Sequence, residues 1–228
     1  MMETPTIQAP QTSSFNMLKA MVVIGVLCAL LIVLTFEGTL PRIQQLRAEA
    51  LEKAVFKVLP GTVSIQAFHY GEEQGFVEIN AKDQSPDLVY AGYDQQGTLI
   101  GMAVEASGQG YADVLGILYG YSPENETIVG FHVLESKETP GLGDKIEKDP
   151  EFLSNFNGLD VSLKDNYKEL KNMIVPVKHG TKTQPWEVDG ITGATISSRA
   201  IGNIMGASTR YWVPLLYSHQ QDFKLTED

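Results

Sequence analysis

The pattern of hydrophobic and polar positions begins with a long apolar run near the N-terminus. Residues 20–36 (AMVVIGVLCALLIVLTF) are almost continuously apolar and lie between Lys19 and Glu37. At a helical rise of roughly 1.5 Å per residue, this run and its flanks reach across a hydrocarbon core about 30 Å thick. The run has no polar face, unlike a core helix, and it is longer than the apolar region of a cleaved signal peptide. We therefore predict a transmembrane helix over residues 17–38, preceded by a flexible polar tail over residues 1–16.

An amphipathic stretch follows the apolar run. Pro41 suits the first turn of a helix, and Pro60 with Gly61 suits its end. Between them, apolar residues recur at helical spacing with charges in between: Ile43, Leu46, Leu51, Ala54, Val55 and Val58. The pattern predicts a stalk helix over residues 39–63 that leads from the membrane to a domain. It suits the first helix of that domain equally well, and the sequence does not separate the two.

The remaining residues, 64–228, form many short apolar or alternating segments bounded by turn residues. They predict strands over residues 75–80, 88–93, 98–105, 114–121, 128–134 and 173–177. A short helix is predicted over residues 150–156 and a final helix over residues 197–216, with one apolar face. Because strands follow one another with few intervening helices, we predict an α+β fold with a mainly antiparallel sheet and flanking helices.

Composition and charge narrow the possible functions. The formal net charge is -11, which argues against nucleic-acid binding because phosphates would be repelled. Cys28 is the single cysteine, so this chain cannot by itself build a disulfide, a zinc knuckle or a thiolate-bound iron–sulfur cluster. The four histidines are scattered without metal-ligand spacing. Any redox chemistry would therefore need an organic cofactor.

The segment DGITGATISS, residues 189–198, carries the strongest chemical signal. Its small residues leave the backbone accessible, and its hydroxyls lie where the final helix begins. The N-terminus of a helix suits a phosphate. Local chemistry alone favours an ordinary helix cap, in which Thr195 or Ser197 accepts a backbone hydrogen bond. A third possibility is a hydrolase with Thr195 as the nucleophile and His179 as its base.

Two other glycine-containing segments could approach a planar ligand. Residues 137–146 (KETPGLGDKI) predict a tight loop whose N–H groups could meet the polar edge of a ligand, with Leu142 as an apolar contact. Residues 107–111 (SGQGY) precede a predicted strand, and Tyr111 could stack on a ring. Taken singly, a rigid surface turn and a plain loop between strands explain them as well.

Together and in this order, the three segments resemble the covalent-FMN-binding domain family. This family includes RnfG of the Rnf ferredoxin–NAD oxidoreductase complex and NqrC of the sodium-translocating NADH–quinone reductase. The continuation Gly143-Asp144-Lys145-Ile146-Glu147 is more similar to RnfG. An NqrC-like protein remains an alternative, as does a membrane-tethered assembly or sensor domain without redox activity.

The resemblance implies a site for FMN. Thr195 would accept the FMN phosphate as a phosphoester, installed by a flavin transferase whose recognition motif includes Asp189. Thr192 stands where the family often has serine and keeps the hydroxyl. No catalytic residue or metal ligand is assigned. The predicted cofactor-binding residues are Tyr111, Glu138, Thr139, Pro140, Gly141, Leu142, Gly143, Asp189, Thr192, Gly193, Ala194 and Thr195.

The resemblance also implies a setting. The chain would relay electrons in ferredoxin–NAD transfer coupled to movement of H+ or Na+. Its partners would be the membrane lipid and the other Rnf subunits, including a second flavinylated membrane subunit and iron–sulfur subunits. Residues 64–228 would lie outside the bacterial cytoplasmic membrane and the N-terminal tail inside. Charge alone points the other way, since only Lys19 lies on the N-terminal side of the apolar run while Arg42, Arg47 and Lys53 follow the span.

Overall fold

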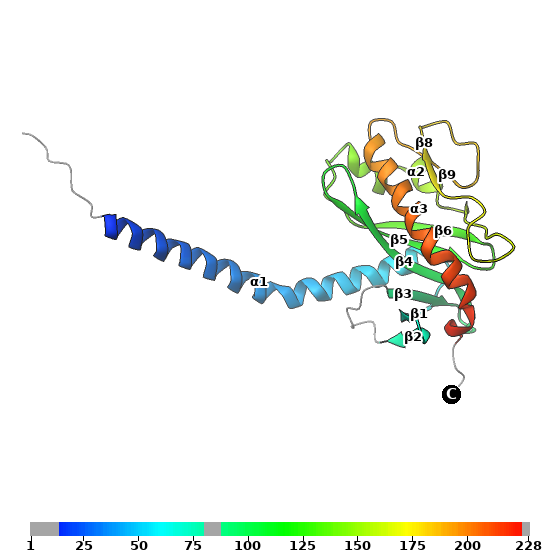
Figure 1. Cartoon of the computed structure of the whole chain (residues 1–228), viewed down its shortest axis with the longest axis horizontal. Coiled ribbons are helices and arrows are strands. Elements are labelled where there is room, and N and C mark those ends of the chain that lie inside the picture. The colour runs from blue at the N-terminus through cyan, green and yellow to red at the C-terminus, as the bar shows by residue number, and fades with distance from the viewer. Residues whose placement is uncertain (1–13, 80–87, 225–228) are drawn as a thin grey trace, which may run out of the picture. The chain divides into compact units, whose positions relative to one another are not determined.

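The computed structural model describes residues 14–79 and 88–224 (Figure 1). The chain divides into two compact units, Met1–Arg47 and Ala48–Asp228, which are described separately. Residues 1–13 of the predicted tail lie outside the described residues. So does residue 80, the last of the first predicted strand.

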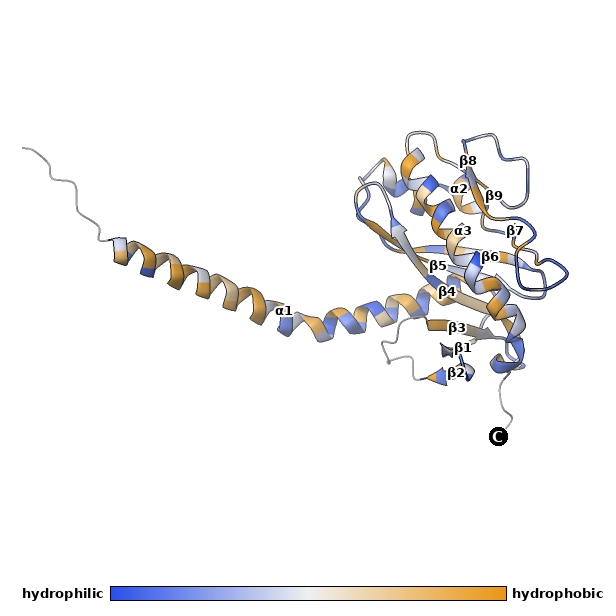
Figure 2. Cartoon of the chain, in the orientation of Figure 1, coloured by the Kyte–Doolittle hydropathy of each residue, from blue (hydrophilic) through white to orange (hydrophobic). Residues whose placement is uncertain are grey.

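The predicted span and stalk belong to one continuous helix, α1 (Ser14–Val58), with Pro41 inside it. Its N-terminal part exposes large apolar side chains from Met21 to Phe36, and the helix is long and apolar enough to cross a membrane. Figure 2 shows this apolar part as a nearly unbroken hydrophobic stretch, followed by a part of mixed character. The helix therefore suggests single-pass membrane anchoring.

Within the described residues of the second unit, an antiparallel sheet of seven strands dominates, which confirms the predicted α+β class. Its order is β2-β1-β3-β4-β5-β6-β7, and every neighbouring pair is antiparallel. The strands are β1 (Ser64–Gly71), β2 (Gly75–Ile79), β3 (Leu88–Tyr93), β4 (Leu99–Gln109), β5 (Val114–Ser122), β6 (Thr127–Glu135) and β7 (Leu159–Asp160). A separate parallel pair is formed by β8 (Val175–Val177) and β9 (Glu187–Asp189).

Helices cover both faces of the sheet. The long helix α3 (Thr195–Ser218) crosses the sheet (Figure 1). It packs on the larger core, where its Ile201, Met205 and Trp212 are buried among aromatic and aliphatic side chains of the strands. The last turns of α1 pack in a smaller core on other sheet residues, through Val55 and Val58. The remaining short helices are η1 (Gly143–Glu147), α2 (Pro150–Ser154) and η2 (Gln220–Phe223). The sheet is thus held between α3 and the end of α1, and α3 begins beside the β8–β9 pair.

The structure departs from the sequence-based prediction at three kinds of element. Strand β1 was not predicted, although it pairs with both β2 and β3. The two-residue β7 and the three-residue β9 are too short to produce a periodic signal. Strand β4 continues to Gln109, which pairs with Val114, so most of the SGQGY segment is strand and not loop. Here the pairing with β5 extends the strand beyond the end that its own sequence pattern predicts.

Gly120 on β5 allows the end of α1 to approach the sheet. A Cβ atom at this position would overlap the carbonyl oxygen of Val58. We therefore expect Gly120→Ala to lower the stability of the full-length protein by about 1–3 kcal/mol, the usual cost of overpacking. Urea denaturation of the parent and the variant in detergent measures this loss of stability. Gly116→Ala on the same strand is the control, because its Cβ would meet Glu135 at 3.4 Å or more, and equal stability of the two variants would contradict the prediction.

Candidate functional site

The segment between β9 and α3 presents Thr195 to solvent. Thr195 is the first residue of α3 and is exposed, as are Thr192 and Gly193, whereas Ala194 is buried. The N-cap residue is Ala194, and no side chain caps the helix. The expectation that Thr195 or Ser197 caps this helix is therefore wrong. Within the described residues, the Thr195 hydroxyl makes no hydrogen bond and is available for another role.

The two serines that follow Thr195 have structural partners instead. The hydroxyl of Ser198 accepts a hydrogen bond from the backbone N–H of Ile191 at 3.1 Å, which closes the turn before the helix. The buried hydroxyl of Ser197 donates to Glu138 Oε2 at 2.7 Å. The local sequence thus holds the first turn of α3 in place while leaving Thr195 free.

Glu138 joins the three segments singled out in the sequence. Its carboxylate is buried, although the sequence suggested a residue bordering a ligand. Oε1 accepts hydrogen bonds from the N–H groups of Tyr111 at 2.7 Å and Ala112 at 3.1 Å, while Oε2 accepts from Ser197. One carboxylate therefore holds the β4–β5 turn, its own loop and the start of α3 together.

Gly143 lies against this junction. A Cβ atom there would collide with Glu138 and stand 3.0 Å from the Ser197 hydroxyl oxygen. An exposed ion pair adds a second link between the loop of residues 137–146 and the β4–β5 turn, because Lys137 Nζ lies 2.5 Å from Asp113 Oδ2. The hydrogen bond from Lys137 lowers the pKa of the Asp113 carboxyl. The pair is therefore ionised at neutral pH.

The outer surfaces of the three joined segments are exposed. Thr139, Pro140 and Gly141 form the outside of the turn, in which the N–H of Leu142 donates to the carbonyl of Thr139 at 3.1 Å. Large apolar side chains stand in solvent at Tyr111, Leu142 and Ile196, each more than half exposed. Each of the three segments contributes one of them. They offer apolar contacts beside the start of α3.

A cavity of about 370 Å³ opens at Thr195. Three basic side chains line it together with Thr192, Gly193 and Thr195: Lys178, His179 and Arg199. Positive charge therefore gathers where the N–H groups of the helix start also attract an anion. The sequence analysis missed Lys178 and Arg199. Arg199 could have been found four residues after Thr195 on the same helix face, but Lys178 follows β8 and is brought here by the fold.

His179 does not serve Thr195 as a base in this structure. Its Nδ1 atom lies 3.0 Å from the carbonyl oxygen of Gly190, and within the described residues no hydrogen bond joins it to Thr195. The contact on which the hydrolase alternative depends is missing.

Asp189 is largely buried at the end of β9 and helps to shape the loop. Its Oδ2 accepts a hydrogen bond from the N–H of Gly180 at 2.8 Å. Asn155, a residue that the sequence did not single out, accepts from the Asp189 N–H at 3.0 Å and donates to its carbonyl at 3.2 Å. Lys182 donates a hydrogen bond to the same Asn155 side chain, and partial burial lowers the pKa of the Lys182 ammonium group. Asp189 and Asn155 thus fix where the β9–α3 loop starts.

Comparisons with known proteins identify the family of this chain. Residues 110–208 match the family model described as FMN-binding domain, a range that contains all three segments except the start of SGQGY. The chain is 32% identical to the G subunit of the ion-translocating oxidoreductase complex of Methanosarcina acetivorans over 196 residues, covering 86% of this chain and 93% of that protein. It is 29% identical to the G subunit of the Na(+)-translocating ferredoxin:NAD(+) oxidoreductase complex of Acetobacterium woodii, over 78% and 82% of the two chains.

Solved structures share the fold. NqrC of Shewanella oneidensis superimposes with a TM-score of 0.57 at 21% identity, covering 78% of this chain and 95% of that one. The corresponding protein of the Na(+)-translocating NADH-quinone reductase from Parabacteroides distasonis gives a TM-score of 0.59 at 24% identity, over 75% and 94% of the two chains. At these identities the likeness concerns the fold alone.

Fold, site and family model together define an FMN-binding domain carried by a helix that can span a membrane. The relatives narrow this class further. The chain belongs to the RnfG family, the G subunits of ion-translocating oxidoreductase complexes. It is therefore a component of such a complex, as the resemblance in the sequence indicated, and other subunits of the complex are implied.

Proposed function

We propose that this chain relays electrons through an FMN group esterified to Thr195. The observation that carries the proposal is the position of the Thr195 hydroxyl: exposed, without a hydrogen-bond partner among the described residues, and at the helix start in a cavity lined by Lys178 and Arg199. A phosphate esterified there keeps a negative charge, which the helix N-terminus and these two cations stabilise.

The three joined segments would position the flavin. Exposed Gly193 would leave the backbone open next to the phosphate and buried Ala194 would hold the loop beneath it, while Tyr111 and Leu142 would give the ring apolar contacts from the exposed surface. Thr139, Pro140, Gly141 and Gly143 would shape that surface, and Glu138 would hold it in place from beneath. The flavin supplies the redox chemistry when bound, and the protein supplies attachment and environment.

Maturation and partners follow from the same proposal. A flavin transferase would join the FMN phosphate to Thr195 and would read a motif that includes Asp189 and Thr192. The mature chain would pass electrons between ferredoxin and NAD within an Rnf-type complex, coupled to movement of H+ or Na+. Its neighbours would be membrane lipid, a second flavinylated membrane subunit and the iron–sulfur subunits.

The test is covalent flavin on a denaturing gel. We expect the full-length protein co-produced with a flavin transferase to show yellow fluorescence at its own band, and the protein produced without the transferase to show none. Mass spectrometry of the tryptic peptide that contains Thr195 then locates the bound group. A colourless band after co-production would favour a non-redox assembly or sensor domain instead.

We also propose the orientation in the bacterial cytoplasmic membrane: a cytoplasmic tail over residues 1–16, a span over 17–38, a stalk over 39–63, and residues 64–228 on the outer, periplasmic side. Cys28 is the single cysteine and lies in the apolar run. One cysteine introduced into the domain can therefore show on which side of the membrane the domain lies. In a Cys28→Ala background, exposed Glu124→Cys should react with a membrane-impermeant maleimide in spheroplasts. Labelling confined to inside-out vesicles would reverse the orientation.

A further inference from the structure

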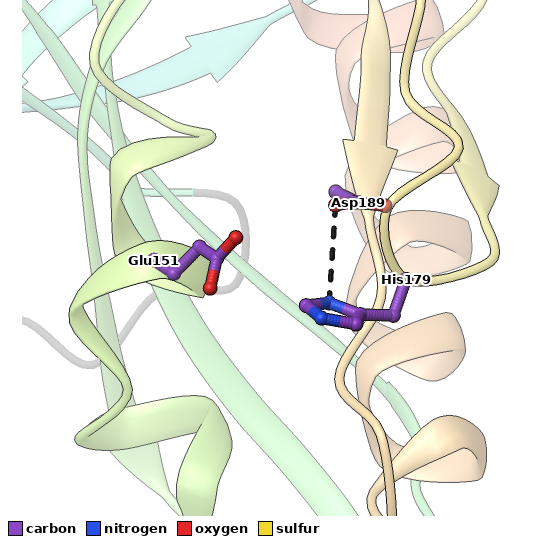
Figure 3. A group of neighbouring side chains, drawn as sticks. All are labelled: Glu151, His179 and Asp189. Carbon is purple, nitrogen blue, oxygen red and sulfur yellow. Dashed lines mark ion pairs between the residues drawn. The ribbon is translucent and has the colours of Figure 1, made fainter.

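Two carboxylates and an imidazole meet near the base of the β9–α3 loop. Glu151 comes from α2, Asp189 ends β9, and His179 lies in the connection between β8 and β9 (Figure 3). One ligand atom of each lies within 4.8 Å of the others. The cluster lies outside the set of residues that the resemblance assigns to the flavin, apart from Asp189.

A small cavity separates these side chains. It measures about 10 Å³ and is lined by Glu151, His179 and Asp189 together with neighbouring residues. That volume is close to the space needed by one water molecule or one ion. Asp189 Oδ1 is buried and has no hydrogen-bond partner among the described residues. A buried carboxylate oxygen without a partner is costly unless a cation or a donor satisfies it.

Local charge also favours a cation. Within the described residues, the ion pair of Asp189 is with His179, at 3.9 Å, a distance too long for a hydrogen bond. Glu151 is exposed, and its carboxylate makes no hydrogen bond or ion pair there. Lys182, the nearby cation, donates its hydrogen bond to Asn155 and acts on Asp189 only through its charge. Within the described residues, no basic side chain therefore donates a hydrogen bond to either carboxylate of the cluster.

The hydrogen bond of His179 leaves one of its ring nitrogens available for a metal. If Nδ1 carries its proton, it donates to the carbonyl of Gly190 at 3.0 Å, which leaves the lone pair of Nε2 for a metal. A backbone carbonyl that fixes the tautomer in this way is a common partner of metal-binding histidines. Protein zinc sites hold their nitrogen and oxygen ligands about 2.0–2.2 Å from the ion. The three ligand atoms, which lie within 4.8 Å of one another, must come somewhat closer together to reach these distances. The exposed side chain of Glu151 can do so by rotating toward the ion.

We propose that Glu151, His179 and Asp189 bind one Zn²⁺ ion. An imidazole with two carboxylates suits zinc better than magnesium, which prefers oxygen ligands alone. Three protein ligands leave the fourth tetrahedral position to water. The ion would join α2, the β8–β9 connection and the start of the β9–α3 loop. Because His179, Gly190 and Ile191 line both this cavity and the one at Thr195, bound zinc would also add positive charge beside that residue.

Zinc binding can be measured without flavin. The full-length protein, produced without a flavin transferase and carrying no histidine tag, is titrated with Zn²⁺ in detergent by calorimetry. We expect one ion per chain, and association at least about tenfold weaker in Glu151→Gln and in His179→Ala, because each removes a direct ligand. Glu147→Gln and His132→Ala, which lie outside the cluster, should leave the affinity unchanged. Failure of flavinylation would not affect this result.

A cobalt spectrum gives a second readout. Co²⁺ in a tetrahedral site absorbs in the visible range, and the parent protein should show this band and lose it when Zn²⁺ is added. His179→Ala should show no band while keeping the circular dichroism of the parent. Absence of stoichiometric zinc binding and of the cobalt band in the parent would overturn the proposal. So would equal zinc affinity in the parent and in the folded Glu151→Gln variant.

Discussion

Thr195→Val is expected to abolish covalent flavin without disturbing the fold. Valine keeps the shape of the side chain and removes the hydroxyl to which the phosphate would be attached. The hydroxyl is exposed and makes no hydrogen bond among the described residues, so stability should change by no more than about 0.5 kcal/mol. In-gel flavin fluorescence after co-production with a flavin transferase measures the loss, and urea denaturation measures the stability.

Thr192→Val is the matched control for this experiment. Thr192 is also an exposed threonine, lies three residues earlier in the β9–α3 loop and lines the same cavity. We expect this variant to retain covalent flavin, with at most a reduced yield because it lies within the proposed transferase motif. If Thr195→Val stays fluorescent while Thr192→Val becomes colourless, the phosphoester belongs to Thr192 and our assignment is wrong.

The second large effect is expected from Glu138→Ala. The change removes the acceptor of two backbone N–H groups and of the Ser197 hydroxyl, all at a buried junction. Hydrogen bonds to a charged group contribute about 1.5–3 kcal/mol each, but they are not additive and water can reach part of the turn. We expect a loss of about 2–4 kcal/mol in the free energy of unfolding. The fraction of protein that carries flavin should fall too, because the three motif segments lose the carboxylate that joins them.

Glu138→Gln separates hydrogen-bond geometry from charge. The amide oxygen can still accept from Tyr111 and Ala112, and the amide nitrogen can donate to the Ser197 hydroxyl, which can also act as an acceptor. This variant should therefore lose less than half as much stability as Glu138→Ala. Equal losses would show that the negative charge itself holds the segments. An unchanged free energy of unfolding in Glu138→Ala would contradict the role of Glu138 in holding the three segments together.

The sequence was sufficient for features that depend on neighbouring residues. The apolar run specifies a helix that can span a membrane, because hydropathy and length are local properties. Alternating segments specify the central strands, and β3 has the bounds that were predicted. The three motif segments, read in order, were enough to indicate the FMN-binding domain. The length of β4, in contrast, was not predicted from its own sequence, because pairing with β5 extends this strand to Gln109.

Tertiary structure decided how the motif residues are used. Glu138 and Ser197 are 59 positions apart, and no periodicity relates them, yet their hydrogen bond joins two of the three segments. Lys178 reaches the cavity at Thr195 from the far end of β8, and Glu151 on helix α2 lies near Asp189 on strand β9. The sequence by itself thus determined a helix that can span a membrane, the class of fold and the place of Thr195 where the final helix begins. Contacts between distant segments, which only packing of the whole chain brings about, decided the charges around Thr195 and the side chains that hold it in place.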